Sequence, residues 1–265
     1  MEYRQLGRSG VPISVIGIGG NQFGRAVDQE GTTRVIHQAI DRGINHIDTA
    51  DMYTGSMSEQ FLGKALAGRR DQVVLATKTG MRMNDGPEGM GLSRRRIMAA
   101  VEASLTRLNT DYIDLYYMHA PDPKTPIEET MRALDDLVTS GKIRYYAFSN
   151  FAGWQVAEFV GECERRGHQV PVVSQSLYNL IERDIETELI PACEHFGLSI
   201  VPFSPLASGF LTGKYRRGEP VPAGVRGAGN ASWQERRLTE QNFAVQDVAE
   251  KFAAEHNRSI SDLAI

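Results

Sequence analysis

The sequence contains few cysteines, no long apolar run and no excess of basic residues. Only two cysteines, Cys163 and Cys193, occur among its 265 residues. Both fall in expected helices without partners at metal-ligand spacing, so we expect reduced thiols and no metal site. No apolar run approaches the length of a membrane span. The formal net charge is -4 with both signs interspersed, which argues against a nucleic-acid or membrane-binding surface.

The rest of the composition is that of one large globular domain. Hydrophobic residues make up 41% and charged residues 23% of the chain, which is ordinary for an α/β protein. No internal repeat, linker or low-complexity segment marks a second domain, so we expect residues 1–265 to form one domain. The first residues, from Met1 to Arg4, lack the apolar core of a signal peptide, and we therefore expect a cytoplasmic protein.

Apolar segments and segments of helical period alternate along the chain. A glycine-rich turn at residues 7–10 predicts a small N-terminal β-hairpin. Seven strand candidates rich in Val, Ile and Tyr follow, at 15–20, 44–48, 73–78, 112–119, 143–150, 172–175 and 198–204. Helical segments lie between them, at about 30–42, 58–67, 93–108, 127–140, 153–166 and 185–196. This order predicts a parallel sheet, and it favours a (β/α)8 TIM barrel over an open doubly wound sheet.

Residues typical of helix ends support these boundaries. Ser58, Ser93 and Thr125 are expected at helix N-termini, the last in a capping box with Glu128. Residues suited to a left-handed C-terminal cap follow six helical segments: Gly43, Gly68, Asn109, Gly141, Gly167 and Gly197.

A closed barrel needs eight strands, and the sequence supplies seven candidates. After Ser204 come a polar loop to about residue 238, a helix near 239–255, and the start of a further helix at 259–265. We therefore expect the barrel to be C-terminally incomplete, without its last strand and helix. The alternative is that another chain or a further segment completes it, because open parallel edge strands are prone to aggregation.

Each expected strand is followed by a polar residue at its C-terminal end. These residues are Asp48, Lys78, His119, Asn150 with Ser149, Gln175 and Ser204. In a parallel barrel such ends lie on one rim, where barrel enzymes carry their active sites. For any single residue, bonding to nearby backbone is the simpler explanation. Six in succession at the same end favour a shared site.

Tyr53, five residues after Asp48, is the expected proton donor. A tyrosine has a reference pKa of about 10, which is high for donation near neutrality. A nearby buried Lys78 would lower that pKa, and Asp48 would balance the buried ammonium. His119 could donate to, or orient, a substrate oxygen. These groups predict general acid catalysis on a carbonyl oxygen without a metal or a covalent nucleophile.

The segments that carry these residues resemble the aldo-keto reductase family, including its channel β-subunit-like and aryl-alcohol dehydrogenase-like members. The resemblance runs from the hairpin to about Tyr215. It rests on DTADMY at 48–53, ATKT at 76–79, LYYMH at 115–119, SNF at 149–151, SQSLYN at 174–179, FSPLASG at 203–209 and LTGKY at 211–215. It implies a (β/α)8 barrel that reduces aldehydes or ketones with NADPH, and it maps the catalytic tetrad onto Asp48, Tyr53, Lys78 and His119.

The resemblance also implies a cofactor site. Ser149, Asn150 and Gln175 would bind the nicotinamide carboxamide, and Phe203 would stack on the ring. Residues implied for the ribose and the pyrophosphate are Gly20 and Asn21 with Asp48, and Ser204, Leu206, Ser208 and Lys214. Arg226 could close over the cofactor. For Arg216 and Arg217, a solvated basic loop is an equally good interpretation.

Three questions stay open at the sequence level. The family's motif for the adenosine 2′-phosphate is absent from these residues, so NADPH rests on family habit and NADH is not excluded. The substrate is expected to be a small carbonyl compound, but the sequence names neither the compound nor the oligomeric state. The alternative function is an NADPH-binding regulatory or sensor subunit with little turnover, as in channel-associated relatives.

Overall fold

The computed structural model describes all 265 residues, and they form two compact units. The first unit comprises Met1–Gln175 and Glu188–Ile200. The second comprises Ser176–Thr187 and Val201–Ile265. None of the helices combines the length and the apolar character needed to cross a membrane.

The chain begins with the predicted hairpin. Strands β1 (Tyr3–Gln5) and β2 (Pro12–Ser14) pair antiparallel, with Tyr3 opposite Ser14. Gly7 in the turn has a φ of +54°, the left-handed region that glycine enters without steric cost.

A parallel sheet of seven strands follows the hairpin, in the order in which the strands occur along the chain. Its strands are β3 (Gly17–Gly19), β4 (His46–Asp48), β5 (Val74–Thr79), β6 (Ile113–Met118), β7 (Ile143–Ser149), β8 (Val173–Leu177) and β9 (Ser199–Phe203). All seven predicted strands are thereby confirmed. The α/β architecture, with its parallel seven-stranded sheet and alternating helices, is that of the (β/α)8 barrel fold. Strands β8 and β9 continue from the first unit into the second.

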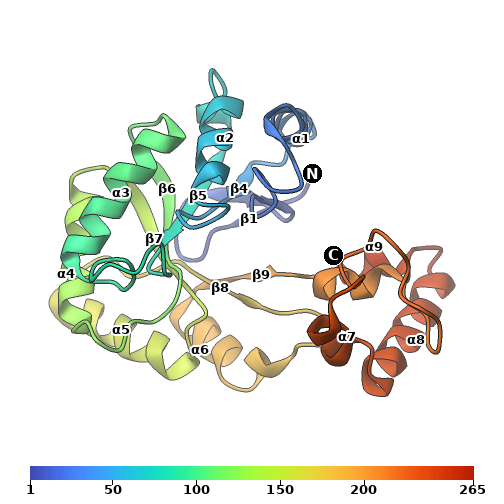
Figure 1. Cartoon of the computed structure of the whole chain (residues 1–265). Helices are drawn as coiled ribbons and strands as arrows, with labels where there is room; N and C mark the ends of the chain where they lie inside the picture. Colours follow the sequence, from blue (N-terminus) through green and yellow to red (C-terminus); the bar gives the residue numbers. More distant parts are fainter. The chain divides into compact units, whose positions relative to one another are not determined.

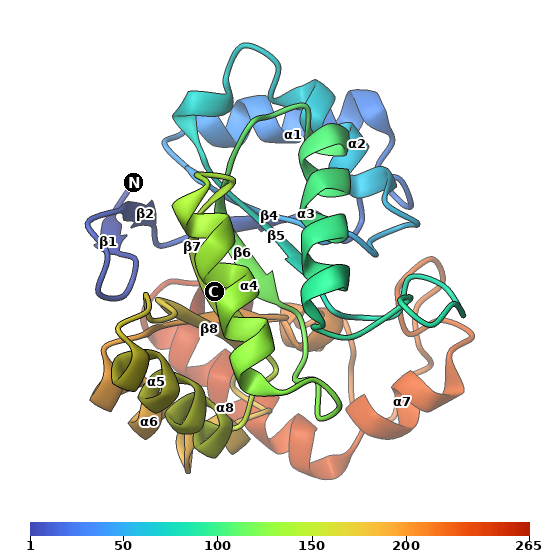
Figure 2. The same cartoon turned by 90° about the vertical axis from the view of Figure 1, so that its left-hand side faces the viewer.

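Six helices alternate with these strands, and consecutive helices from α1 to α6 pack against one another (Figures 1 and 2). They are α1 (Gln29–Asp41), α2 (Met57–Ala65), α3 (Arg94–Leu108), α4 (Ile127–Thr139), α5 (Gly153–Arg166) and α6 (Leu189–Phe196). Short 3-10 helices, η1 (Arg70–Gln72) and η2 (Asp184–Glu186), precede β5 and α6. The predicted left-handed residues after the helices are confirmed, including Asn109 at φ +51°.

Two predicted N-caps are wrong. Helix α2 begins one residue before Ser58, and its cap is the left-handed Ser56. Ser58 is instead buried in the first turn, where its hydroxyl donates to Gly20 O over 2.8 Å. The cap of α4 is Pro126, because the Thr125 hydroxyl donates to the Asp122 carboxylate. Ser93 caps α3 as predicted and accepts from Arg96 N.

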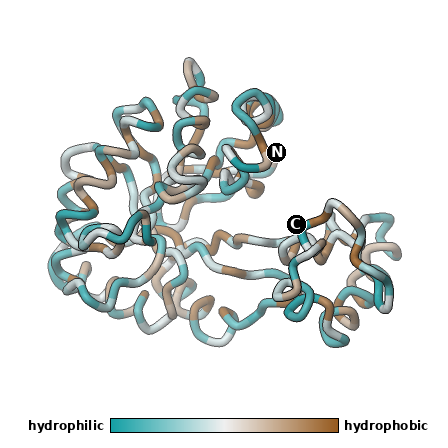
Figure 3. The backbone as a smooth tube through the Cα atoms, in the orientation of Figure 1, coloured by the Kyte–Doolittle hydropathy of each residue, from teal (hydrophilic) through white to brown (hydrophobic).

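The core of the first unit lies between the sheet and its helices. Every residue of β5 is buried, and so are five of the six residues of β6. Strands covered on both faces need apolar residues at successive positions, which explains the absence of strict alternation in the sequence. Along the helices, hydrophilic and hydrophobic positions alternate (Figure 3), as expected for one buried and one solvated face.

The second unit has a core of its own. Its helices are α7 (Ala231–Arg237), α8 (Glu240–Glu255) and α9 (Ile260–Ala264), with the 3-10 segment η3 (Ala207–Thr212) before them. Phe210, Tyr215, Trp233 and Phe243 are the large buried side chains of this core. The prediction of an irregular loop to residue 238 is therefore wrong at η3 and α7. The predicted helices near 239–255 and after Ser259 are confirmed.

Candidate active site

Strand pairing in the first unit brings the predicted polar residues to one end of the sheet. Asp48 of β4 pairs with Ala76 of β5, and Lys78 pairs with Tyr117 of β6. The chain stays in register beyond the strand ends, because His119 N donates to Thr79 O over 2.8 Å. Asn150 N likewise donates to Gln175 O over 3.1 Å.

Asp48 and Lys78 form a buried ion pair at this end. The Lys78 ammonium is completely buried and donates to Asp48 Oδ1, while Asp48 retains 13% side-chain exposure. Lys78 Nζ also donates to Thr49 O over 2.7 Å. A buried ammonium needs such partners because desolvation strongly disfavours an isolated charge. The predicted pairing of these two residues is confirmed.

Tyr53 lies beside this ion pair. Lys78 Nζ is 5.1 Å from the centre of the Tyr53 ring. Burial raises the pKa of Tyr53, and the positive charge of Lys78 acts in the opposite direction without cancelling that effect. The expectation of a lowered tyrosine pKa is therefore wrong in its net sign, although the contribution of Lys78 has the predicted direction. Tyr53 consequently holds its proton at neutral pH.

His119 completes the cluster. Its ring lies 5.7 Å from the Tyr53 ring, centre to centre, in an edge-on arrangement. Burial, reinforced by the charge of Lys78, lowers the pKa of His119 to about 3. The imidazole is therefore neutral at physiological pH, and its buried Nδ1 has no hydrogen-bond partner. A neutral imidazole can donate one hydrogen bond and accept another.

The three residues expected to bind a carboxamide lie next to this cluster. Gln175 Nε2 donates to Asp48 Oδ2 over 3.0 Å, a contact that the sequence did not predict. Asn150 Nδ2 donates to His119 O and to Ser149 Oγ, each over 3.0 Å. Asn150 adopts a left-handed conformation with φ +61°. The amide carbonyl oxygens of Gln175 and Asn150 remain free to accept.

Gly20 and Asn21 follow β3 at the same end of the sheet. Gly20 N donates to Asp48 O over 2.7 Å. A Cβ at Gly20 would lie 2.8 Å from Ser58 Oγ and 3.1 Å from Asp48 O, so only glycine allows this close approach. Asn21 is exposed.

The remaining predicted cofactor residues belong to the second unit. Phe203 ends β9, and Ser204 O accepts from Asn179 Nδ2 over 3.1 Å. Ser208 and Gly209 are successive left-handed residues in η3, and Leu206 precedes that segment. The Lys214 ammonium lies near Gly209, where the φ of +95° suits a glycine.

The three arginines of the following loop differ in their contacts. Arg216 Nη1 donates to Glu250 of α8 over 2.8 Å. Arg217 bonds Asp247 and Glu240 of the same helix, both at about 3 Å. These ion pairs favour the solvated basic loop for Arg216 and Arg217. Arg226 is exposed and makes no ion pair.

Sequence reasoning missed Asp51 and Arg96. Asp51 lies in the same motif as Asp48 and Tyr53 and is only 1% exposed. Its Oδ2 accepts from Arg96 Nη2 of α3 over 2.7 Å. The available signal was a second carboxylate inside an otherwise apolar strand end.

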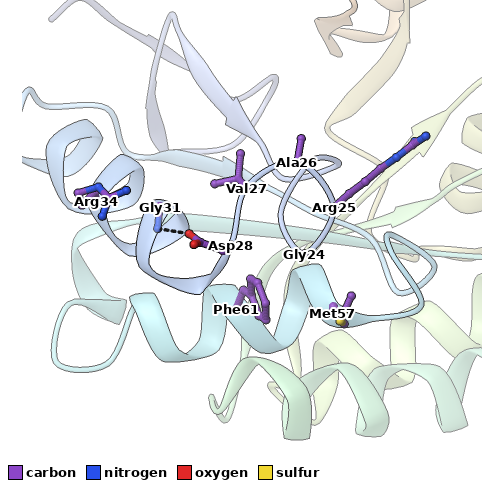
Figure 4. A pocket seen from close by; sticks show the side chains of 9 residues that line it. All are labelled: Gly24, Arg25, Ala26, Val27, Asp28, Gly31, Arg34, Met57 and Phe61. Carbon is purple, nitrogen blue, oxygen red and sulfur yellow. Dashed lines mark hydrogen bonds between the residues drawn. The ribbon is translucent and has the colours of Figure 1, made fainter. Parts of the chain in front are cut away.

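A surface hollow of about 540 Å³ lies apart from these residues, beside the N-terminus of α1 (Figure 4). Two of its polar side chains have partners within the chain. Asp28 accepts from Gly31 N over 2.8 Å, and Arg34 pairs with Glu30. The residues that line it are Gly24, Arg25, Ala26, Val27, Asp28, Gly31, Arg34, Met57 and Phe61, and none of them is a predicted site residue.

Comparison with known proteins identifies the family of this chain. The Aldo/keto reductase family matches residues 15–265. An uncharacterized oxidoreductase of Bacillus subtilis is 40% identical, over 92% of this chain and 78% of the relative. A probable voltage-gated potassium channel subunit beta of Arabidopsis thaliana is 37% identical over 85% and 70%. The L-glyceraldehyde 3-phosphate reductase of Escherichia coli is 32% identical over 100% and 79%. The chain therefore belongs to the aldo/keto reductase family of NAD(P)H-dependent oxidoreductases.

Proposed function

We propose that this protein reduces an aldehyde or ketone to an alcohol with NADPH, and that Tyr53 donates the proton to the carbonyl oxygen. The observation that supports this most directly is the buried Asp48–Lys78 pair, with Tyr53 and His119 beside it. A tyrosine next to a buried ammonium is suited to general acid catalysis. Proton loss creates a tyrosinate, whose negative charge the neighbouring lysine stabilises.

Asp48 acts on Tyr53 through Lys78: it holds the ammonium, and the ammonium stabilises the tyrosinate. Asp48 Oδ1 and Thr49 O hold the Lys78 ammonium in place. Because the pKa of Tyr53 is raised by burial, the hydroxyl stays protonated until a substrate oxygen with developing negative charge accepts the proton. Lys78 then faces a tyrosinate in a site from which water is largely excluded, where the attraction between the two charges is strong.

His119 is proposed to orient the substrate oxygen. With a pKa of about 3, it carries no charge at neutral pH, so it acts through a hydrogen bond rather than through an ion pair. Its edge-on position against the Tyr53 ring would direct the substrate oxygen toward the phenol hydroxyl. Proximity of this kind reduces the entropic part of the barrier.

The chain also has groups that fit the nicotinamide end of the cofactor. Free amide carbonyls of Asn150 and Gln175 suit the amide N–H groups of a carboxamide, and the hydroxyl of Ser149 lies beside them. Gly20 allows the close packing of β3 against Asp48 and Ser58 next to these groups. When bound, the nicotinamide supplies the hydride for the carbonyl carbon. The choice of NADPH over NADH, and the contacts of Phe203, Ser204, Leu206, Ser208, Lys214 and Arg226, are proposed from family resemblance.

The test follows NADPH absorbance with a panel of aldehydes and ketones. Tyr53→Phe should lower kcat by about 100- to 10,000-fold, the usual contribution of a positioned general acid. The dissociation constant for NADPH, measured by fluorescence titration, should stay within about twofold because the phenol ring remains. Tyr112→Phe is the matched control. Tyr112 precedes β6, at the opposite end of that strand from His119, and its substitution should leave kcat unchanged.

Two results would contradict this proposal in different ways. Normal turnover by Tyr53→Phe would exclude Tyr53 as the donor. Tight NADPH binding without turnover of any carbonyl compound would favour the alternative of a regulatory or sensor subunit. That alternative is suggested by relatives named as probable voltage-gated potassium channel subunits beta.

A further inference from the structure

Asp51 is a buried carboxylate between Asp48 and Tyr53 that the proposed mechanism does not use. Its side chain accepts from Thr79 Oγ1 over 2.8 Å and from Arg96 Nη2 over 2.7 Å. Its backbone is held as well, because Asp51 N donates to Lys78 O over 3.0 Å. The Ser56 hydroxyl donates to Asp51 O over 2.7 Å. Asp51 is thus bonded to strand β5, to helix α3 and to the turn that follows Tyr53.

That turn has an unfavourable backbone conformation. Thr54, Gly55 and Ser56 have φ values of +55°, +60° and +72°, so three successive residues are left-handed. Two of them carry a Cβ, which disfavours this region. Such conformations persist only where the surroundings determine them. Here the Thr54 hydroxyl donates to Phe23 O over 3.0 Å, and Ser56 donates to Asp51.

Asp51 therefore links the Tyr53 turn to the strand that carries Lys78. Lys78 and Thr79 are adjacent in β5, and adjacent side chains point to opposite faces of a strand. Lys78 reaches Asp48 on one face, while Thr79 bonds Asp51 on the other, and Asp51 in turn pairs with Arg96. Asp51 bonds both the carbonyl of Lys78 and the hydroxyl of Thr79. The relative position of Tyr53 and Lys78 depends on these bonds.

We propose that the Asp51 cluster, defined as Asp51, Thr79 and Arg96, positions Tyr53 for proton transfer. This inference rests on the proposed role of Tyr53 as the donor. None of the three side chains is assigned contact with substrate or cofactor, so they are positioning residues. Arg96 belongs to the first turn of α3, and the cluster thereby makes the geometry of the proton donor dependent on the placement of that helix.

The chain contains a matched control for this cluster. Glu59 of α2 accepts from Thr77 Oγ1 over 2.6 Å and from Arg107 Nε of α3 over 2.6 Å. The Glu59 cluster of Glu59, Thr77 and Arg107 thus combines the same groups from β5 and α3. Its carboxylate lies in the first turn of α2 and bonds Thr77 and Arg107, not the turn that follows Tyr53.

The first experiment compares Asp51→Asn and Arg96→Leu with Glu59→Gln and Arg107→Leu, each confirmed as folded by circular dichroism. In the Asp51 cluster, kcat should fall about 10- to 100-fold, since misplacement of a reacting group by about 1 Å has effects of this size. KM and the NADPH dissociation constant should change by less than about threefold. Arg96→Lys, which keeps the cation, should recover most of the activity. The control variants should retain the wild-type kcat.

A second readout observes Tyr53 without cofactor or substrate. Protein containing 3-fluorotyrosine gives a fluorine resonance for Tyr53 that Tyr53→Phe identifies. In the wild type this resonance should be a single sharp line. In Asp51→Asn and Arg96→Leu it should shift and broaden or split, whereas the Glu59-cluster variants should leave it unchanged.

Ser56→Gly should fold even if the variants that change a buried charge, Asp51→Asn and Arg96→Leu, do not. Glycine favours the left-handed φ of position 56, yet it removes the hydroxyl that bonds Asp51 O. We expect a smaller loss of kcat, about three- to tenfold, with the same change in the fluorine line.

The outcomes separate the two proposals. If Tyr53→Phe is inactive but the Asp51 cluster variants match their controls in kcat and in the fluorine line, the positioning role is wrong and the donor role stands. If Tyr53→Phe turns over normally, both are wrong.

Discussion

The two buried carboxylate clusters of the first unit have the same composition in different settings. In each, a carboxylate accepts from a β5 threonine and an α3 arginine. Glu59 lies in the first turn of the regular helix α2. Asp51 lies on the irregular segment that ends in three left-handed residues.

Under the proposed positioning role, the Asp51–Arg96 pair acts on Tyr53, whereas the Glu59–Arg107 pair is only structural. Around Glu59, loss of the pair would leave the α2 backbone in its helical conformation. Around Asp51, no regular structure holds Tyr53, so the bonds of the Asp51 side chain and of Ser56 add to a few backbone bonds, such as Asp51 N to Lys78 O and Tyr53 N to Ala50 O.

The largest expected effect on stability is in the Glu59 cluster. Arg107→Leu would leave Glu59, whose side chain is 0% exposed, without its cation and should reduce the free energy of unfolding by about 3–5 kcal/mol. Arg96→Leu should cost less, because burial raises the pKa of Asp51 and its carboxyl can take up a proton when the cation is lost. Urea unfolding at pH 7 measures both. Equal losses would show that the two clusters do not differ in this respect.

Residue patterns predicted the part of the site that depends on strand ends. Asp48, Lys78, His119, Asn150 and Gln175 follow buried apolar runs, and parallel strands bring such residues to one edge. Among their contacts, only the pairing of Asp48 with Lys78 was predicted, because it follows from opposite charge. The structure shows this bond.

The missed features depend on three-dimensional burial. Arg96 belongs to the run Arg94-Arg95-Arg96, which is typical of a solvated helix face. Only the structure distinguishes Arg94, whose side chain is 48% exposed, from Arg96 at 11%. The predicted direction of the Tyr53 pKa shift was likewise wrong, because that direction depends on how strongly burial opposes the charge of Lys78. Ser58 was wrongly predicted as the N-cap of α2. The left-handed turn before this helix contains only one glycine, so little in the sequence indicates where the helix begins.

A second comparison concerns how the stability of the wild type and of a His119 variant depends on pH, because the candidate site contains a histidine that burial keeps neutral. The folded-state pKa of His119 is about 3, against an ordinary value of 6.5. Between these values the unfolded chain binds a proton that the folded protein does not, so stability falls as the pH decreases from 6.5 toward 3. His119→Asn should remove this contribution. The wild type should lose about 2–3 kcal/mol more than the variant between about pH 6.5 and 4.5.

Urea unfolding at several pH values tests this expectation. The pKa of buried His46 is also lowered, but His46 is present in both proteins and cancels in the comparison. Asp51 has the opposite sign, because its raised pKa favours the folded state as the pH falls. Parallel stability curves for wild type and His119→Asn would contradict the assignment of a neutral His119.

The smallest expected effect concerns Ser58, which is next to Glu59 in the sequence. The Ser58 side chain bonds groups near the candidate site and not the arginine of α3. Its hydroxyl donates to Gly20 O over 2.8 Å and lies 2.7 Å from Thr49 Oγ1, and Thr49 O in turn accepts from Lys78. Ser58→Ala should reduce the free energy of unfolding by about 1 kcal/mol, the usual net value of a hydrogen bond. Ser140→Ala, which removes a hydroxyl bonded only to Leu137 O within one helix end, should cost less. If urea unfolding gives equal losses, the buried hydroxyl of Ser58 does not stabilise the link between β3, β4 and α2.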